Sequence, residues 1–175
     1  GFTTSRTELH TTRAGGPMPG TYADEAELLG IGSAIGALGG KGIYGLVSDF
    51  RDWEQEMDWM QRLSVENHCQ VNFVLFFREE GDWDRVLKQL DYVRRANAGG
   101  ARLVPHVGAR PVNILLSWDG TINPFSFHGN YARLSIMSHG ERLAELRRPE
   151  VRAAILAEPL PLLGDPFMDT IIGGY

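Results

Sequence analysis

Strand-like and helix-like segments alternate along the first two thirds of the chain, and this alternation constrains the fold more than any other feature. The chain opens in a strand-like segment, and further apolar runs typical of strands occupy residues 42–47, 71–77 and 102–107. Segments with helical periodicity lie between these runs. Strand and helix repeating at a spacing of ~30 residues are typical of βαβ units, whose successive strands run parallel. The pattern therefore predicts an α/β fold built on a parallel sheet.

The expected helices carry recognisable start signals. A first helix is predicted over 21–38, where Asp24 precedes Glu27 by three residues, as in an N-terminal capping pair. Asp52 stands in the same relation to Gln55 at the start of a second helix. A third helix has an apolar stripe that we expect to face the core, formed by Trp83, Val86, Leu87, Leu90 and Val93.

The regular alternation ends near Trp118. Residues 112–118 predict one more short strand, whereas residues 120–130, rich in Gly, Asn and aromatic side chains, indicate a loop. Two helical pieces are predicted over 138–158, divided by Pro149, which suits the first turn of the second piece.

Composition excludes several classes of protein. The formal net charge of −5 argues against a nucleic-acid-binding scaffold, because such domains are usually basic. The single Cys69 excludes an intramolecular disulfide and a zinc site built from several cysteines. No apolar run approaches the ~20 residues that a membrane-spanning helix needs, and the first residues do not resemble a signal peptide. We therefore expect a cytoplasmic protein whose partners include neither nucleic acid nor a membrane.

Candidate functional residues follow the expected strands, because the sites of parallel α/β folds gather at the carboxyl ends of their strands. Asp49 has the chemistry of a base or a metal ligand, and so has His106. Arg6 and Arg110 carry guanidinium groups, which bind carboxylates in a bidentate manner. The polar residues after the four expected strands are Ser5, Arg6, His10, Ser48, Asp49, Arg51, Arg78, Glu79, Glu80, His106 and Arg110.

Each main candidate also has a structural interpretation. Asp49 would fix a turn or cap a helix, and His106 would hydrogen-bond a loop carbonyl. Arg110 would fasten its loop, and Arg6 and His10 would be ordinary loop residues. The sequence contains no H-x-H, H-E-x-x-H, Walker A or G-x-S-x-G motif that would decide the chemistry.

Several phrases, in their order along nearly the whole chain, resemble a known family. They are GFTTSRTELH (1–10), PGTYADEAEL (19–28), GGKGIY (39–44), ANAGGARLVPHVGARPV (96–112), NPFSFHGNYARL (123–134) and RRPEVRAAIL (147–156). Together they resemble the D-aminoacylase (N-acyl-D-amino-acid deacylase) branch of the amidohydrolase superfamily, in one of its less characterised subgroups.

This resemblance implies a partial (β/α)₈ TIM barrel, since a full barrel takes ~250 residues. Residues 1–118 would supply βα units of the barrel, and residues 119–175 a loop and helical extension of the same domain. Because the chain opens at Gly1 inside a strand-like segment, we expect it to be a fragment of a longer protein. The remaining segments of that protein, or an oligomer partner, would cover the open edge of the sheet.

The resemblance also implies a metal-dependent hydrolase that cleaves the C–N bond of an N-acyl amino acid or a related small-molecule amide. A divalent metal, expected to be zinc, would lower the pKa of its bound water and polarise the scissile carbonyl. Asp49 and His106 would face the catalytic centre. Arg6, His10 and Arg110 would contact an anionic substrate.

Two other functions stay open. The segments 42–49 and 71–77 contain no histidine where the resembled family carries metal-site histidines, so no metal ligand is assigned. A metal-free binding or assembly protein of the same fold is therefore an alternative to the enzyme. An unrelated open α/β domain that binds a small anion at a switch point of its sheet is another. In every case we expect the fragment alone to be catalytically inactive.

Overall fold

The protein consists of two compact units, Gly1–Ala109 and Arg110–Tyr175, and each has a hydrophobic core of its own. The computed structural model describes residues 1–77, 80–109, 115–120 and 122–159. Within these ranges no helix is long and apolar enough to cross a membrane.

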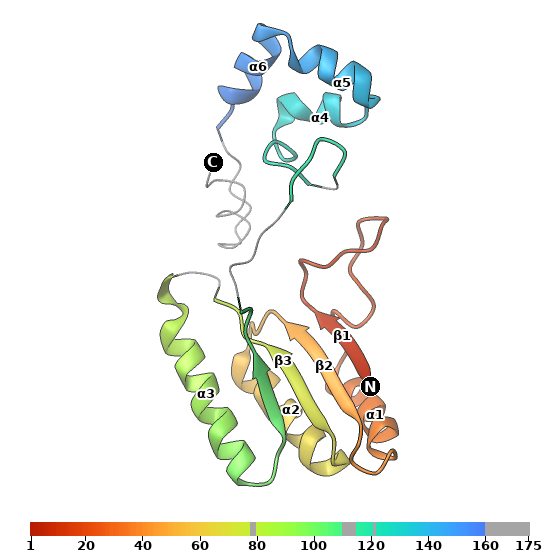
Figure 1. Cartoon of the computed structure of the whole chain (residues 1–175), viewed down its shortest axis with the longest axis vertical. Coiled ribbons are helices and arrows are strands. Elements are labelled where there is room, and N and C mark those ends of the chain that lie inside the picture. The colour runs from red at the N-terminus through yellow and green to blue at the C-terminus, as the bar shows by residue number, and fades with distance from the viewer. Residues whose placement is uncertain (78–79, 110–114, 121, 160–175) are drawn as a thin grey trace. The chain divides into compact units, whose positions relative to one another are not determined.

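The first unit is a parallel sheet whose four strands lie side by side in chain order (Figure 1). The strands are β1 (Phe2–Arg6), β2 (Ile43–Ser48), β3 (Gln70–Val74) and β4 (Leu103–His106). The helices are α1 (Glu25–Gly36), α2 (Trp53–Asn67) and α3 (Trp83–Ala98), the last preceded by the 3-10 turn η1 (Glu80–Asp82). The prediction of an α/β fold with parallel strands alternating with helices is confirmed.

Two of the predicted helix starts are confirmed by their capping hydrogen bonds. Asp24 accepts the backbone N–H of Glu27 at 2.9 Å, and Asp52 accepts that of Gln55 at 3.0 Å. Each bond satisfies one of the amide groups that have no partner inside the helix. These caps fix where α1 and α2 begin, directly after the loops that follow β1 and β2.

The three helices cover one face of the sheet. α1 packs on α2 and α2 packs on α3, so all three belong to one layer. Alternate strand residues point into this layer and are at most 6% exposed: Tyr44, Leu46, Val71, Phe73 and Leu103. Because strand side chains alternate between faces, the positions between them belong to the opposite face.

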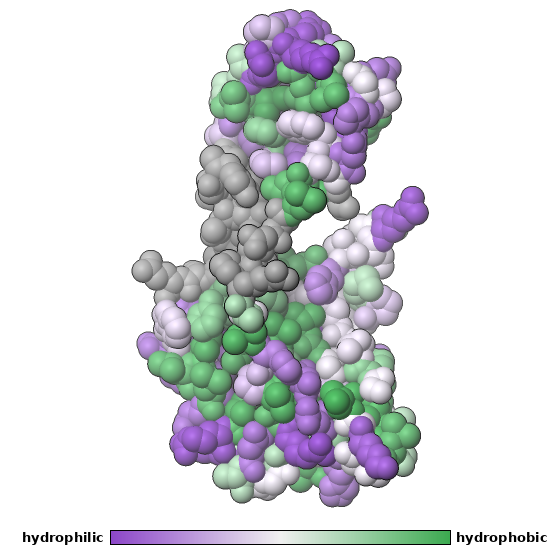
Figure 2. Space-filling model, viewed as in Figure 1, coloured by the Kyte–Doolittle hydropathy of each residue, from purple (hydrophilic) through white to green (hydrophobic). Residues whose placement is uncertain are grey.

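The opposite face of the sheet is only partly covered in the described part of the chain. Its side chains are half-buried or exposed, in contrast to the helix-covered face: Thr3, Ser5, Gly45, Val47, Asn72, Val74, Val104 and His106. In Figure 1 the strands lie in front of α2, and Figure 2 shows apolar and polar residues mixed over this unit. Purely parallel sheets are usually buried on both faces. We call this surface the open face.

The stripe predicted on α3 is only partly correct. Val86 and Val93 are buried, but Trp83, Leu87 and Leu90 are 60%, 57% and 41% exposed. The buried face of α3 is formed by residues 86, 89, 93 and 96. The fully buried Gln89 occupies a position where an apolar residue would be expected. At 3.6 residues per turn, positions 83, 87 and 90 form the neighbouring face. Trp83 packs against Phe77, with ring centres 4.6 Å apart, but the flank Trp83–Leu87–Leu90 is still an exposed apolar surface.

Strand β4, which contains Pro105, is the last strand of the described sheet. The carbonyl groups of Arg102 and His106 accept the backbone N–H groups of Val71 and Leu75 in β3. The backbone groups of the alternate residues Leu103 and Pro105 therefore point outward, away from β3. Both outward groups of Leu103 are bound by the Asn97 side chain, at 2.8 and 2.9 Å. Pro105 has no N–H at all.

Helices α1 and α2 approach most closely at glycines. A Cβ atom added at Gly36 would lie 2.3 Å from the backbone oxygen of Asn67, and one at Gly32 would lie 2.8 Å from Leu63 Cγ. A Cβ at Gly30, on the same helix, would meet nothing within 4 Å. The glycines at 32 and 36 are therefore required by helix packing, whereas Gly30 is not.

We predict that Gly36→Ala destabilises the first unit by about 2 kcal/mol, because overpacking against a backbone atom is costly. Gly30→Ala, the matched control, should raise stability by about 0.5 kcal/mol through its higher helix propensity. Urea unfolding followed by circular dichroism measures both. Equal effects of the two substitutions would show that the close approach of α1 to α2 does not hold in solution.

The second unit is a small group of helices, α4 (Gly129–Ser135), α5 (His139–Leu146) and α6 (Pro149–Leu156). Its core contains Tyr131, Leu134, Val151 and Ile155. The two helical pieces predicted over 138–158 are confirmed, with a capping box at Ser138 and Glu141 and with Pro149 in the first turn of α6. Helix α4 was not expected from the sequence.

The sequence expectations for the connection between the units are only partly covered by the structure. Of the strand expected over 112–118, residues 112–114 lie outside the described residues, and residues 115–118 are not in a strand. The contacts divide the chain after Ala109. That residues 119–175 extend the same domain as 1–118 stays a prediction.

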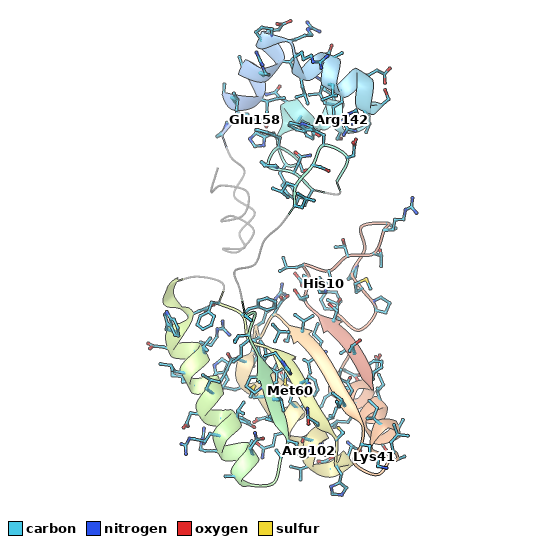
Figure 3. The ribbon with its side chains drawn as sticks, viewed as in Figure 1. His10, Lys41, Met60, Arg102, Arg142 and Glu158 are labelled. Carbon is cyan, nitrogen blue, oxygen red and sulfur yellow. The ribbon has the colours of Figure 1, made fainter. Side chains whose placement is uncertain are left out.

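Two polar side chains hold the second unit together. Arg142 is 8% exposed and donates to the carbonyl groups that end α4, those of Leu134 and Ser135 among them. The Glu158 carboxylate accepts the N–H groups of Gly129 and Asn130, at 2.5 and 2.9 Å, at the other end of α4. These backbone hydrogen bonds hold the pKa of Glu158 below its usual value. Figure 3 labels both side chains.

The lowered pKa of Glu158 predicts a pH dependence for the second unit. A carboxyl whose pKa is depressed by folding contributes stability above its unfolded pKa and loses it as the pH falls through the folded pKa. The helices of this unit should therefore weaken on acidification, and Glu158→Gln should reduce that dependence. A carbon-13 NMR titration of Glu158 measures the effect directly. A midpoint at or above that of glutamate in an unfolded peptide would contradict the capping role.

Candidate functional site

The predicted candidate residues that the structure describes lie along one edge of the sheet. In a parallel sheet all carboxyl ends of strands meet at the same edge, and the register pairs Arg6 with Ser48 and Val74 with His106 there. Figure 3 shows His10 beyond the end of β1, whereas Lys41 and Arg102 lie at the opposite edge. We call the edge formed by the strand ends the carboxyl edge.

Arg6 points from the carboxyl edge into the helix layer. Its Nε lies 3.1 and 3.0 Å from the two carboxylate oxygens of Glu56, and its Nη2 lies 2.7 Å from Oε1. Nη1 donates to the carbonyl of Ala23 at 2.7 Å, and the guanidinium lies 5.6 Å from the ring centre of Trp59. The two charged side chains are only 15% and 12% exposed. The structure thus gives Arg6 protein partners, and its contact with a substrate stays a prediction.

Ser48 extends this ion pair into the loop after β2. Its hydroxyl donates to Glu56 Oε2 at 2.9 Å and accepts the N–H of Phe50 at 3.0 Å. Phe50 has a φ of 49°, in the left-handed region that non-glycine residues seldom adopt. The hydrogen bond to Ser48 helps to hold this turn, which leads directly into α2.

Asp49 fastens the loop that follows β1. Its Oδ2 accepts the backbone N–H of Glu8 at 2.9 Å, and its own N–H donates to the carbonyl of Arg6 at 3.3 Å. The alternative of a turn residue is therefore supported by contacts. The catalytic interpretation of Asp49 stays a prediction.

A pocket of about 280 Å³ lies beside these residues. At its mouth Arg51 pairs with Glu8, and Tyr22 donates its hydroxyl to Glu8 at 2.9 Å. This hydrogen bond to a carboxylate raises the pKa of Tyr22 above its usual value. The pocket is lined by Arg6, Glu8, Thr21, Tyr22, Ala23, Ser48, Asp49, Phe50, Arg51, Asp52, Gln55 and Glu56. The acidic residues outnumber the two arginines, so the pocket is not a simple anion site.

Ser5 and His10 form a second group, on the open face. Because strand side chains alternate, Ser5 points away from the helix layer that its neighbour Arg6 enters. Ser5 Oγ lies 2.9 Å from His10 Nδ1. His10 is exposed and belongs to the turn after β1, whose N–H groups bind Thr7. The predicted residue His10 is thus placed beside a hydroxyl group.

His106 ends β4 on the same open face as Ser5. The register places Ser5 beside Val47 and Val74 beside His106, in one row across the sheet. At a spacing of ~4.8 Å between strands, His106 lies about 10 Å from the end of β2 and about 14 Å from Ser5. Asp49 and His106 therefore share the carboxyl edge, as predicted, but they are too far apart for direct contact.

The remaining expectations concern metal binding and reactive groups. Arg110 lies outside the described residues. Among the residues that the structure does describe, no three His, Cys, Asp or Glu side chains come together as metal ligands, so this part of the chain does not fit the implied metal. Cys69 is buried, and burial raises the pKa of its thiol, which suits a core residue better than a nucleophile.

Sequence reasoning missed Glu56, the partner of Arg6. A signal for it was present, since Glu56 lies between Trp53, Met57 and Met60 on the apolar face of a predicted helix. A carboxylate on a buried helix face requires a partner. Tyr22, at the pocket mouth, was missed because a single tyrosine in a loop carries no such signal.

We predict that Glu56→Gln lowers the free energy of unfolding by about 3 kcal/mol, because it leaves the largely buried Arg6 charge without its counter-ion. Glu54→Gln on the exposed side of α2 serves as the control and should change stability by less than ~0.5 kcal/mol. Urea unfolding measures both. Similar small effects would show that the Arg6–Glu56 pair contributes little to the fold.

Comparison with known proteins found no match to this chain among protein-family models, curated proteins or solved structures.

Proposed function

We propose that this chain is part of a (β/α)₈ barrel hydrolase that cleaves the amide C–N bond of an N-acyl amino acid or a related amide. The substrate would lie at the carboxyl edge, over the open face. The fold and the placement of polar groups support the proposal, and the resemblance of the sequence to D-aminoacylases gives the reaction class.

The observation that carries the proposal is the strand order together with the single helix layer. In a doubly wound sheet the strand order reverses, helices cover both faces, and ligands bind at the switch point. The described sheet runs β1–β2–β3–β4 without a reversal, and α1, α2 and α3 form one layer. This arrangement supports consecutive βα units of a barrel, and it argues against a switch-point anion site within the described sheet.

Two exposed surfaces support the same conclusion. The open face of the sheet would become the barrel interior, and the exposed flank Trp83–Leu87–Leu90 of α3 lies where a following helix would pack. Burying these side chains against water would be favourable by ~25 cal/mol per Å² of apolar surface. The remaining segments of a longer protein, or an oligomer partner, would supply the covering elements.

The carboxyl edge supplies groups suited to amide hydrolysis. His106 presents an exposed imidazole on the open face, and Asp49 lies two strands away along the same edge. A substrate spanning about 10 Å would reach both, which follows from the strand spacing. The described residues offer no complete set of metal ligands, so no step of the proposal passes through a metal.

The test uses the longer protein that carries this chain and a panel of N-acyl amino acids, with release of the free amino acid as the readout. His106→Ala should lower kcat/KM by about 100-fold or more, the usual contribution of an acid–base group. His139→Ala, in the second unit, is the matched control and should leave kcat/KM unchanged.

Two results would contradict the proposal. Unchanged kcat/KM in His106→Ala would remove His106 from the site. Binding of N-acyl amino acids without any release of amino acid would support the metal-free binding protein instead of the enzyme.

A further inference from the structure

The contact between Ser5 and His10 places a hydroxyl beside an imidazole at the carboxyl edge. Ser5 Oγ lies 2.9 Å from His10 Nδ1, which is a full hydrogen bond. Such a contact within hydrogen-bond reach is the geometric condition for a base to activate a nucleophile. The pair lies at the end of β1, on the face opposite to the Arg6–Glu56 ion pair.

The surrounding residues hold His10 in place. Thr7 is 2% exposed, its carbonyl accepts the N–H of His10 at 3.4 Å, and its hydroxyl accepts the N–H of Leu9 at 3.2 Å. The next residue, Glu8, is bound through its N–H to the Asp49 carboxylate. The turn that carries His10 is thus fastened by the buried Thr7 and, at Glu8, by Asp49 in the loop after β2. Asp49 therefore acts as a positioning residue for this turn.

Ser5 is fixed more firmly than its partner. It belongs to β1 and is paired with Val47 of β2 in the parallel ladder. Its neighbour Arg6 is held by four hydrogen bonds to Glu56 and Ala23, which prevents the strand from sliding. A rigid strand therefore presents the hydroxyl, and a short fastened turn presents the imidazole.

We propose that Ser5 is a nucleophile toward activated acyl groups and that His10 is its general base. Ser5 Oγ attacks the carbonyl carbon of an acyl donor while its proton passes to His10 Nδ1. The bond from carbon to the leaving oxygen or nitrogen then breaks, and the leaving group takes the proton from His10. The acyl group stays on Ser5 Oγ as an ester until water hydrolyses it, with His10 again accepting and returning a proton.

This inference goes beyond the proposed function, because Ser5 lies about 14 Å from His106 and so acts on a different bond. It is tested with an activated aryl ester, p-nitrophenyl acetate, which needs no amide specificity. Failure of this test with amide hydrolysis intact would refute Ser5 as nucleophile but not the hydrolase. Acetylation of Ser5 without amide hydrolysis would support Ser5 as a nucleophile and contradict the amide hydrolase.

The 175-residue chain is incubated with p-nitrophenyl acetate, and acetylated residues are located by peptide mass spectrometry. We expect a 42 Da addition at Ser5 that is absent in Ser5→Ala, by the mass of an acetyl group exchanged for a proton. His10→Asn keeps a side chain whose amide oxygen can accept a hydrogen bond from the Ser5 hydroxyl, but it has no basic nitrogen. It should slow acetylation of Ser5 by at least ~10-fold.

The controls separate this chemistry from nonspecific labelling. Ser135→Ala and His139→Ala remove an exposed hydroxyl and an exposed imidazole from the second unit, and they should leave the labelling of Ser5 unchanged. Circular dichroism shows that each variant is folded. Equal rates in the native chain and His10→Asn, or acetylation confined to Lys41 and the amino terminus, would overturn the proposal.

Discussion

The ion pair between Arg6 and Glu56 is the interaction on which the carboxyl edge depends. It joins the last residue of β1 to α2 across the end of β2, and Ser48 binds the same carboxylate. Two charges this far from solvent are expensive to bury, and their value lies in fixing geometry more than in net stability. With β1 locked to α2, the loops after β1 and β2 begin from defined positions. The Asp49 contact to Glu8 then joins one loop to the other.

Because strand side chains alternate between faces, the neighbouring residues Ser5 and Arg6 lie in two different environments. Arg6 enters the helix layer, whereas Ser5 faces the open side with His10 beside it. A shift of β1 by one residue would exchange the two faces, placing a serine under the helices and an arginine on the open face. The Arg6–Glu56 ion pair can form in only one of these registers. The ion pair of Arg6 is thereby the reason that Ser5 faces the open side.

The sequence was sufficient to predict the sheet and the helix starts, because both depend on local signals. Asp24 and Asp52 cap the helices they were expected to cap, and Pro105 lies in the terminal strand of the sheet. The inward face of α3 was misjudged because Gln89 occupies a buried position, so hydrophobicity alone pointed to the wrong side of the helix. Which strand-end residues meet was also beyond prediction, since Arg6 and Glu56 are 50 residues apart in the chain.

The hydrogen bonds between the Asn97 side chain and β4 limit which further strand can pair with this edge of the sheet. The asparagine amide occupies both outward backbone groups of Leu103, and Pro105 offers only a carbonyl. A strand from another molecule would therefore find few free backbone groups to pair with at this edge, which disfavours fibril-like association. A strand that does belong there must start its pairing beyond Leu103. The edge of β4 thereby restricts the register of any strand that pairs with it, independently of how side chains pack.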